Sequence, residues 1–269
     1  MSECYLFASG KGGVGKSTLA ANLAVLLARS GRTVTLIDAD LGLRSQDLLL
    51  GLENQVVYDL MDVARGKCLL SQALLTLPDL PSLRLLPAAQ FVRCRDLDPG
   101  RLKKMIALLR RDSDFIFLDC PAGLERGLRN VLNAGKNLYT LVVVTPDDLC
   151  VRDAERVIAL SADKKLPAPK LLVNRLRNDL IHRGEMMSAQ TVSDVLDVPL
   201  LGEIPEDDAF CLSQLRHKLV VDYDCEARKA FTRIAARMQG GDEAFPAYGR
   251  KRPSLLRTWL HPVPQEVKK

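Results

Sequence analysis

The sequence predicts an α/β protein with a doubly wound, mostly parallel sheet flanked by helices. Apolar runs of strand length alternate with helical patterns along most of the chain, as in proteins built from parallel strands and crossover helices. Several runs are apolar at nearly every position, which is typical of strands buried on both faces. The chain has 269 residues, 47% hydrophobic and 26% charged, so it can bury one large core. We expect one domain over residues 1–240, followed by a linker and tail over 241–269.

The expected elements follow one another in strand-then-helix order. The predicted strands are residues 4–9, 33–38, 82–88, 115–119, 140–146, 170–175 and 199–205. The predicted helices are residues 17–30, 99–111, 149–162, 188–196 and 224–238. Gly31 can end the first helix and Pro99 can begin the second, since glycine is common just after a helix and proline at its first position. We find no internal repeat.

The charge of the chain is unevenly distributed. The net charge is +5, and six of the 38 Lys and Arg residues but only one of the 33 Asp and Glu residues lie in 250–269. Residues 1–249 therefore carry 32 basic and 32 acidic side chains. A body without a basic excess is poorly suited to coating DNA, so a nucleic-acid partner is not expected.

The cysteines and the hydropathy pattern point to a reducing compartment. The cysteines are scattered and form no C-x-x-C pair, at positions 4, 68, 94, 120, 150, 211 and 225. This pattern argues against a disulfide framework and against a zinc site. No apolar run reaches the length of a transmembrane helix, and the N-terminus lacks a secretion signal. We therefore expect a cytoplasmic protein.

The stretch "SGKGGVGKST", residues 9–18, matches the phosphate-loop pattern G-x-x-x-x-G-K-[ST] between a predicted strand and a predicted helix. Backbone N–H groups of such a loop turn toward phosphates. Lys16 would neutralise the β and γ phosphates, and the Ser17 hydroxyl can ligate Mg²⁺. The sequence thus predicts ATP or ADP binding with Mg²⁺ by Gly10, Lys11, Gly12, Gly13, Val14, Gly15, Lys16, Ser17 and Thr18.

Lys11 is a second lysine in the same loop, where one nucleotide needs only Lys16. The positive charge of Lys11 is repelled by that of Lys16 unless a nearby anion compensates it. From the loop entrance Lys11 could reach the phosphates of a second protomer and stabilise transition-state charge there, which would make dimerisation nucleotide-dependent. The alternative is a solvated surface lysine.

Three carboxylates follow predicted strands at the edge where parallel sheets bind ligands. Asp38 and Asp40 end the second strand, and Asp119 ends "FIFLD" in the manner of a Walker B carboxylate facing Mg²⁺. One of the first two can face the metal shell and the other the γ-phosphate. The alternative for that pair is exposed turn aspartates.

"KGGVGKST" resembles the deviant Walker A signature of the MinD/ParA family of ATPases, and the resemblance extends over about residues 4–239. It implies an Mg²⁺-dependent ATP hydrolase in which Lys11, Lys16 and Asp40 are catalytic. Lys11 would contact nucleotide across a face-to-face dimer, and Asp40 would orient the attacking water. The metal residues would be Ser17, Asp38 (through metal-bound water) and Asp119. The adenine would lie by Asn174, Arg175, Pro205, Glu206 and Asp207, and the dimer partner by Lys11, Arg152 and Asp153.

Three longer stretches resemble the MinD branch of this family: "DADLGLRSQDLLLGLENQVVYDL", "VRDAERVI" and "HRGEMMSAQTVSDVLDVPLLGEIPED". The resemblance implies an ATP-dependent homodimer that lies on the inner face of the cell membrane and takes part in septum placement. Its partners would be a MinC-like division inhibitor and a MinE- or DivIVA-like regulator. Two departures stand out. Residues 145–147 are Thr-Pro-Asp instead of Asn-Pro-Glu, and the segment after "IPED" lacks the family's Asn-x-Gly.

The tail carries a short amphipathic pattern between Pro253 and Pro262. Leu255, Leu256, Trp259 and Leu260 lie on one side, next to the basic cluster 250–252. Two helical turns are unstable in water, but apolar burial and anionic lipid could hold them weakly on a bilayer. Pairing two tails in a dimer would strengthen that attachment. A helix packed back on the domain and a disordered basic tail are the alternatives.

Other functions remain open on the sequence alone. A positional ATPase for flagella is disfavoured by Arg44 and by the lack of an N-terminal activation helix. A ParA-type DNA partition ATPase is disfavoured by the neutral body. A metal-insertion ATPase is disfavoured by the missing C-x-x-C pair.

Overall fold

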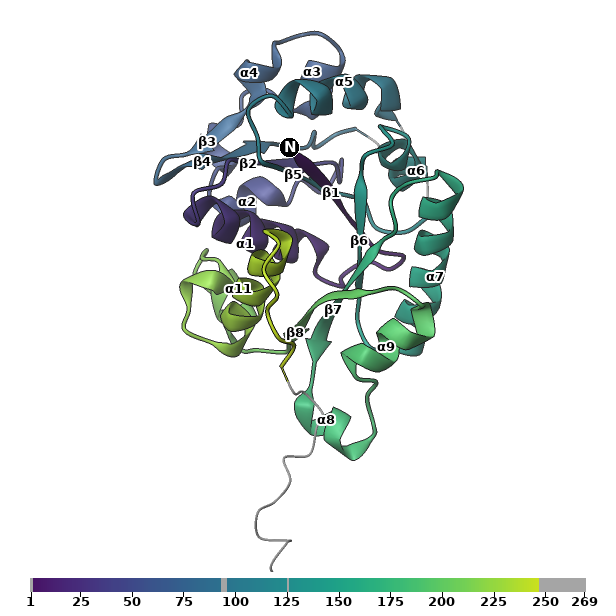
Figure 1. Cartoon of the computed structure of the whole chain (residues 1–269). Helices are drawn as coiled ribbons and strands as arrows, with labels where there is room; N and C mark the ends of the chain where they lie inside the picture. Colours follow the sequence, from purple (N-terminus) through teal and green to yellow (C-terminus); the bar gives the residue numbers. More distant parts are fainter. Residues whose placement is uncertain (1, 93–95, 125, 247–269) are drawn as a thin grey trace, which may run out of the picture.

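In the part of the chain that the structure describes, eight strands form one sheet in the order β3-β4-β2-β5-β1-β6-β7-β8 (Figure 1). The structure is a computed structural model that describes residues 2–92, 96–124 and 126–246. The strands are β1 (Glu3–Ala8), β2 (Val34–Asp38), β3 (Leu75–Leu77), β4 (Leu80–Leu86), β5 (Phe115–Asp119), β6 (Tyr139–Val144), β7 (Lys170–Leu176) and β8 (Leu200–Pro205). All neighbouring pairs are parallel except β3 and β4, which are antiparallel. The predicted mostly parallel, doubly wound sheet is therefore confirmed.

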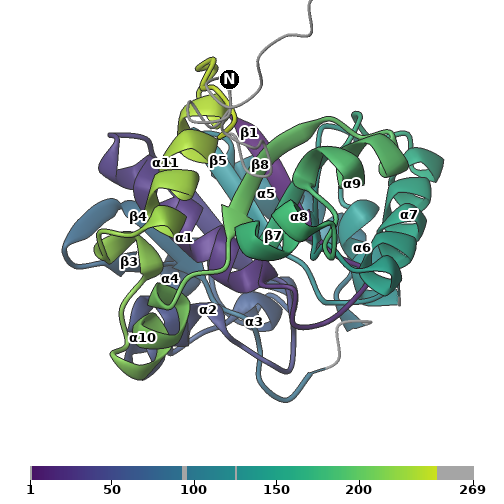
Figure 2. The same ribbon diagram turned by 90° about the horizontal axis from the view of Figure 1, so that it is seen from below.

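Helices cover both faces of this sheet. They are α1 (Lys16–Arg29), α2 (Gln46–Leu50), α3 (Leu60–Ala64), α4 (Leu70–Ala73), α5 (Pro99–Leu109), α6 (Arg126–Leu132), α7 (Asp148–Asp163), α8 (Asn178–Arg183), α9 (Ala189–Leu196), α10 (Ala209–Leu215) and α11 (Glu226–Met238), with 3-10 turns at Glu53–Gln55 and Val220–Asp222. Seen from below, α1 and α11 lie side by side on one face, while α6, α7 and α9 lie on the other (Figure 2). The sheet is thus buried between two helical layers.

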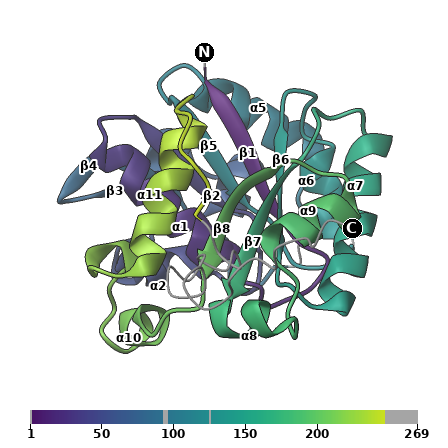
Figure 3. The ribbon, with the colours of Figure 1, turned by 60° about the horizontal axis from the view of Figure 1, so that its bottom comes forward.

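The central strands are buried because their sequences are apolar throughout. β1 lies between β5 and β6 near the middle of the sheet (Figure 3). All five residues of β5 are buried, and so are the last five residues of β1 and of β6. Phe7 of β1 and Phe117 of β5 meet edge to face, with ring centroids 5.0 Å apart. This packing fixes the carboxyl ends of β1 and β5 next to each other.

The register of these strands brings the candidate residues to one edge. Phe7 pairs with Asp119 across β1 and β5, and Asp38 pairs with Asp119 across β2 and β5. The chain leaves β1 directly into the phosphate loop. The loops that carry the predicted lysines and carboxylates therefore start side by side, as expected for ligand sites at the carboxyl edge of a parallel sheet.

The structure adds short elements that the sequence pattern missed. β3 and β4 form a hairpin across Pro78 and Asp79, and the strand expected at 82–88 begins two residues earlier and ends before Pro87, whose ring leaves no N–H for the ladder. Helices α2, α3, α4, α6, α8 and α10, each of seven residues or fewer, are too short for a periodicity to show. Within the described residues, no helix is both long and apolar enough to cross a membrane.

Candidate nucleotide and metal site

The phosphate loop (residues 9–18) connects β1 to α1 and is shaped by its glycines. Gly13 and Gly15 have φ of 75° and 100°, backbone conformations that other residues rarely adopt. A Cβ atom on Gly15 would lie 2.5 Å from Nδ2 of Asn174, and one on Gly10 would lie 2.5 Å from the Cβ of Asp153. The loop is therefore wrapped against β7 and α7 at a closeness that only glycine allows. This is the cradle that phosphates require.

Two side chains of β7 hold the phosphate loop in place. Asn174 donates its amide to the Val14 carbonyl at 2.8 Å, and Arg175 donates to the Gly13 carbonyl at 2.7 Å. Asn174 is 3% exposed, and its Oδ1 is buried without a hydrogen-bond partner. The structure thus places both predicted base-binding residues against the loop itself, where they orient its peptide groups. Asn174 Oδ1 is the acceptor left over for a ligand donor.

Asp38 shapes the switch I loop (residues 39–45), which connects β2 to α2. Its Oδ1 accepts a hydrogen bond from the Asp40 N–H at 3.1 Å, and its Oδ2 accepts from the N–H groups of Ser45 and Gln46 at 3.0 and 3.1 Å. Asp38 is fully buried, and burial, followed by the neighbouring Asp119 charge, raises its pKa well above the usual value. The side chain therefore both faces the predicted metal region and closes the loop that carries Asp40.

Asp119 is surrounded by the groups expected of a metal carboxylate. It is fully buried, and this burial raises its pKa, while the Ser17 hydroxyl, the Gln46 amide and the Lys16 charge lower it. The Gln46 amide donates to Asp119 Oδ2 at 2.7 Å and to the Ser17 carbonyl at 3.1 Å. The first residues of α1, the end of β5 and the start of α2 therefore meet at one point.

Asp40 and Lys16 belong to the same cluster of charged groups as Asp119. Lys16 is 6% exposed. Burial, and then the Asp119 charge, raises the pKa of Asp40 to about 6, while Lys16 opposes the shift. A carboxyl with a pKa near neutrality beside a buried lysine suits the binding and orientation of a water molecule.

The residues present fit Mg²⁺. Asp119 Oδ1 and Gln46 Oε1 are buried with no hydrogen-bond partner, so two oxygen acceptors are left over beside Ser17. In the described ranges there is no cluster of three or more His, Cys, Asp or Glu side chains able to hold a metal. Mg²⁺ with a nucleotide does not need one, because it keeps several waters and takes ligands from the phosphates and from one or two protein groups. Ser17 and Asp119, with Asp38 behind them, are the residues that would hold it.

Lys11 lies at the mouth of the site and points to α7. Its ammonium is 3.6 Å from Asp147 Oδ1, and the two side chains are 47% and 45% exposed. Asp147 caps α7 by accepting from the Cys150 N–H at 3.0 Å, and it also accepts from the Thr145 hydroxyl at 2.6 Å. Burial raises the pKa of Asp147, but these hydrogen bonds and the Lys11 charge outweigh it and lower the pKa below the usual value. Lys11 is therefore held by an exposed, weak ion pair within its own chain.

A cavity of about 300 Å³ opens beside Lys11 on the side of the predicted base site. It is lined by residues 11–14 and 145–147 and by Arg175, Met186 and Glu206. Pro205 ends β8, and the Glu206 N–H donates to the Leu176 carbonyl at 2.9 Å. Asp207 instead turns inward, accepting from the N–H groups of Ala209 at 2.9 Å and Ala227 at 3.1 Å. Of the three residues predicted here, Glu206 lines this cavity and Asp207 fastens α10 and α11.

The predicted dimer-interface and membrane residues remain to be placed. Arg152 is exposed on α7. Asp153 lies directly behind Gly10, and its Oδ1 is 3.7 Å from Arg156 Nη1. The predicted membrane residues Leu255, Leu256, Trp259 and Leu260 lie outside the described residues.

The sequence reasoning gave no role in the site to Gln46, and it used Arg44 only as a family feature without a structural role. Gln46 carries no charge and lies in "RSQDLLLGL", where nothing but its place after the switch I loop marks it. Arg44 has a φ of 47° and pairs with the buried Asp47, and it also donates to the Glu53 carbonyl at 3.1 Å. Its position three residues before an aspartate was the only local signal.

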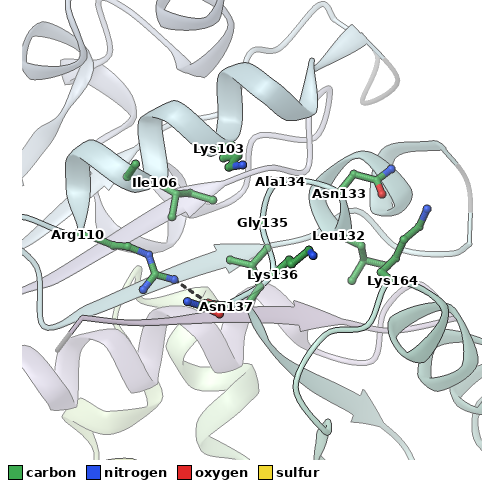
Figure 4. A pocket seen from close by; sticks show the side chains of 12 residues that line it. Lys103, Ile106, Arg110, Leu132, Asn133, Ala134, Gly135, Lys136, Asn137 and Lys164 are labelled. Carbon is green, nitrogen blue, oxygen red and sulfur yellow. Dashed lines mark hydrogen bonds between the residues drawn. The ribbon is translucent and has the colours of Figure 1, made fainter.

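A larger cavity of about 720 Å³ lies at the amino ends of the strands, opposite the phosphate loop (Figure 4). It is lined by the end of α5, the segment between α6 and β6, and the end of α7, and it carries Lys103, Arg110, Lys136 and Lys164. Arg110 donates to the Asn137 carbonyl at 2.6 Å, as drawn in Figure 4. These residues precede β5, β6 and β7, so they lie at the amino ends of the strands, far from the phosphate loop. This cavity is not part of the candidate site.

Comparison with known proteins agrees with this geometry. Residues 5–220 match the family described as the CobQ/CobB/MinD/ParA nucleotide binding domain. The chain belongs to the MinD/ParA family. This family consists of P-loop ATPases, so the predicted MinD/ParA fold and the phosphate loop are those of an ATPase family.

Relatives of known name match over nearly the whole chain. The putative septum site-determining protein MinD of Guillardia theta is 42% identical over 247 residues, covering 91% of each chain. The septum site-determining protein MinD of Helicobacter pylori is 42% identical over 260 residues, covering 94% of this chain and 96% of the relative. The predicted resemblance to the MinD branch of the MinD/ParA family is therefore confirmed.

Solved structures of this MinD/ParA branch have the same fold. The MinC:MinD cell division protein complex of Aquifex aeolicus matches with a TM-score of 0.83 and 37% identity, covering 93% of this chain and 100% of that one. MinD of Pyrococcus horikoshii complexed with Mg-ADP matches with a TM-score of 0.79 and 30% identity, covering 88% and 96%. Nucleotide and Mg²⁺ binding is thus a property of the family.

Proposed function

We propose that this chain is a Mg²⁺-dependent ATPase that closes as a homodimer on ATP and takes part in placing the septum during cell division. The observation that carries the proposal is the cluster of a buried Lys16, the Ser17 hydroxyl, the buried Asp38 and Asp119 and the half-buried Asp40, which interact with one another at the end of the phosphate loop, with Lys11 half exposed beside that loop. The septum-site-determining relatives support the biological role.

Binding would use the parts that the fold holds rigid. The N–H groups of the phosphate loop and the Lys16 ammonium bind the triphosphate, and β7 keeps the loop open through Asn174 and Arg175. Mg²⁺, when bound beside Ser17 and Asp119, supplies charge neutralisation for the phosphoryl group. The base is taken by the cavity lined by Glu206 and Arg175. In this proposal the base also contacts the peptide groups next to Pro205.

Hydrolysis would use Asp40 and a lysine from each protomer. Asp40 lies on a loop closed by Asp38, which fixes its direction, and its pKa of about 6 suits a carboxylate that orients water near neutral pH. Lys11 is half exposed to water and forms an ion pair with the equally exposed Asp147, and such exposed pairs contribute little to stability. Lys11 would therefore lose little free energy on leaving Asp147 for the phosphates bound to a partner, where it would stabilise transition-state charge.

Membrane attachment would follow from dimerisation. In this proposal the tail of residues 250–269 lies on the anionic inner face of the cell membrane, and two tails in one dimer bind more tightly than one. The protein would then be cytoplasmic with ADP and peripheral on the membrane with ATP. A MinC-like inhibitor would dock on the dimer, as the MinC:MinD complex of the Aquifex relative suggests, and a MinE- or DivIVA-like regulator would act on it.

Sedimentation with liposomes tests the proposal. The full chain, Lys11→Ala and a chain ending at Gly249 are mixed with anionic vesicles and either ATP or ADP. The proposal expects the full chain to sediment with ATP but not with ADP, and the two variants to stay in solution with both nucleotides. Equal sedimentation with ATP and ADP would overturn the switch. Salt-sensitive DNA binding by the chain ending at Gly249 would point to a partition ATPase instead.

A further inference from the structure

Gln46 joins the three elements that converge on the metal region. It is fully buried at the first position of α2. Its backbone N–H donates to Asp38 Oδ2 at 3.1 Å, and its side-chain amide donates to Asp119 Oδ2 at 2.7 Å and to the Ser17 carbonyl at 3.1 Å. One residue therefore touches all three of the predicted metal-binding positions.

The other end of this side chain has no partner. Gln46 Oε1 is buried and makes no hydrogen bond, and neither does the neighbouring Asp119 Oδ1. Leaving a buried amide oxygen without a partner is costly, which points to a ligand that satisfies it. Both oxygens can either ligate a cation directly or accept hydrogen bonds from the water molecules around it. Both belong to side chains that contact Ser17, the second residue of α1.

We propose that Gln46 is a positioning residue for Mg²⁺, whose amide nitrogen holds the Asp119 carboxylate and whose carbonyl oxygen accepts from the hydration shell of the metal. The inference rests on the proposed nucleotide function and adds a residue to its metal site. Because the same residue is tied to Asp38 through its backbone, binding of Mg²⁺ with nucleotide would also order the switch I loop, which carries Asp40.

Substitution of Gln46 separates this role from simple packing. Gln46→Leu keeps the apolar stem but removes both the amide donor and the oxygen. Groups that orient a metal ligand typically contribute about 10–100-fold to metal affinity, so we expect the Mg²⁺ concentration for half-maximal ADP binding to rise about tenfold. Gln46→Glu places a second carboxylate beside Asp119, so we expect its thermal midpoint to fall without metal and to recover with Mg²⁺ and ADP. Gln55→Leu, at an exposed position nine residues away, is the matched control.

Two readouts on the full chain decide the question without measuring turnover. The first is Mg²⁺-dependent binding of a fluorescent ADP analogue, and the second is hydrogen exchange of residues 39–46 with and without Mg²⁺ and ADP. We expect protection of this loop on binding in the wild type and in Gln55→Leu, and its loss in Gln46→Leu.

The outcomes are distinguishable. If Gln46→Leu is less stable but binds ADP with the wild-type Mg²⁺ dependence, Gln46 is a packing residue and the inference is wrong. If the wild type itself binds ADP without any Mg²⁺ dependence, the proposed function fails before the inference is reached.

Discussion

The buried Glu203 side chain should make the free energy of unfolding depend on pH. It lies on β8, is 7% exposed, and its Oε1 has no hydrogen-bond partner in the described part of the chain. Burial raises its pKa from 4.5 to about 7, although the charges of Arg233 and Arg237 oppose the shift. Arg237 is engaged elsewhere, donating to the Leu201 carbonyl at 2.9 Å and lying over the Phe245 ring.

The sign of the effect follows from linkage. The folded state holds the Glu203 proton up to a higher pH than the unfolded state does, so this group's contribution to stability is full below about pH 4.5 and is lost as pH rises toward 7. Each pKa unit corresponds to about 1.4 kcal/mol, so the loss reaches up to about 3 kcal/mol at neutral pH. Glu203→Gln removes the ionisation while keeping the shape.

The assay is denaturant unfolding at a series of pH values for the wild type, Glu203→Gln and the exposed control Glu155→Gln. We expect Glu203→Gln to match the wild type near pH 4.5 and to be more stable by up to about 3 kcal/mol above pH 7. The control should stay within about 0.5 kcal/mol of the wild type throughout. If the free energies of Glu203→Gln and of the wild type run parallel over this range, the buried carboxyl does not titrate as argued.

Three further substitutions test the packing and the site. Gly202→Ala should cost about 1–3 kcal/mol or more in unfolding free energy, because its Cβ would lie 2.2 Å from Ile234; a wild-type denaturation midpoint would contradict the close contact between β8 and α11. Asn174→Ala should weaken ADP binding severalfold in a fluorescence titration while far-UV circular dichroism stays native, since the Val14 carbonyl loses its donor; unchanged affinity would show that the loop holds itself. Asp147→Asn keeps the cap of α7 but removes the charge facing Lys11, so it should leave the thermal midpoint unchanged and speed ATP-dependent dimerisation in stopped-flow light scattering; a slower reaction would mean that Asp147 assists Lys11.

Much of the fold was predictable because its signals are local and repeated. The runs at 115–119 and 140–146 are apolar at almost every position, so they could be recognised as buried strands, and β5 and β6 lie within two residues of those bounds. Parallel topology then places Asp38, Asp40 and Asp119 at one edge without further information. The short helices and the β3–β4 hairpin carry too few residues for any period to appear.

The side-chain partners at the site could not be predicted, because they join residues far apart in the sequence. The bond from Asn174 to Val14 spans 160 positions, and that from Gln46 to Asp119 spans 73. A motif says which residue types approach a phosphate, but the direction of an amide is set by tertiary packing. For the same reason Lys11 could be recognised as an extra cation, while its contact with Asp147 emerged from the fold.

The central claim is that Lys11 acts in the pocket of its partner, and mixing two inactive variants tests it most directly. Lys11→Ala keeps its own Asp40 but offers no lysine, while Asp40→Ala offers the lysine but cannot orient water. We expect each alone to be nearly inactive and the mixture to hydrolyse ATP, since a mixed dimer restores one complete pocket. If the mixture stays at the average of the two separate activities although mixed dimers form, Lys11 does not work across the interface.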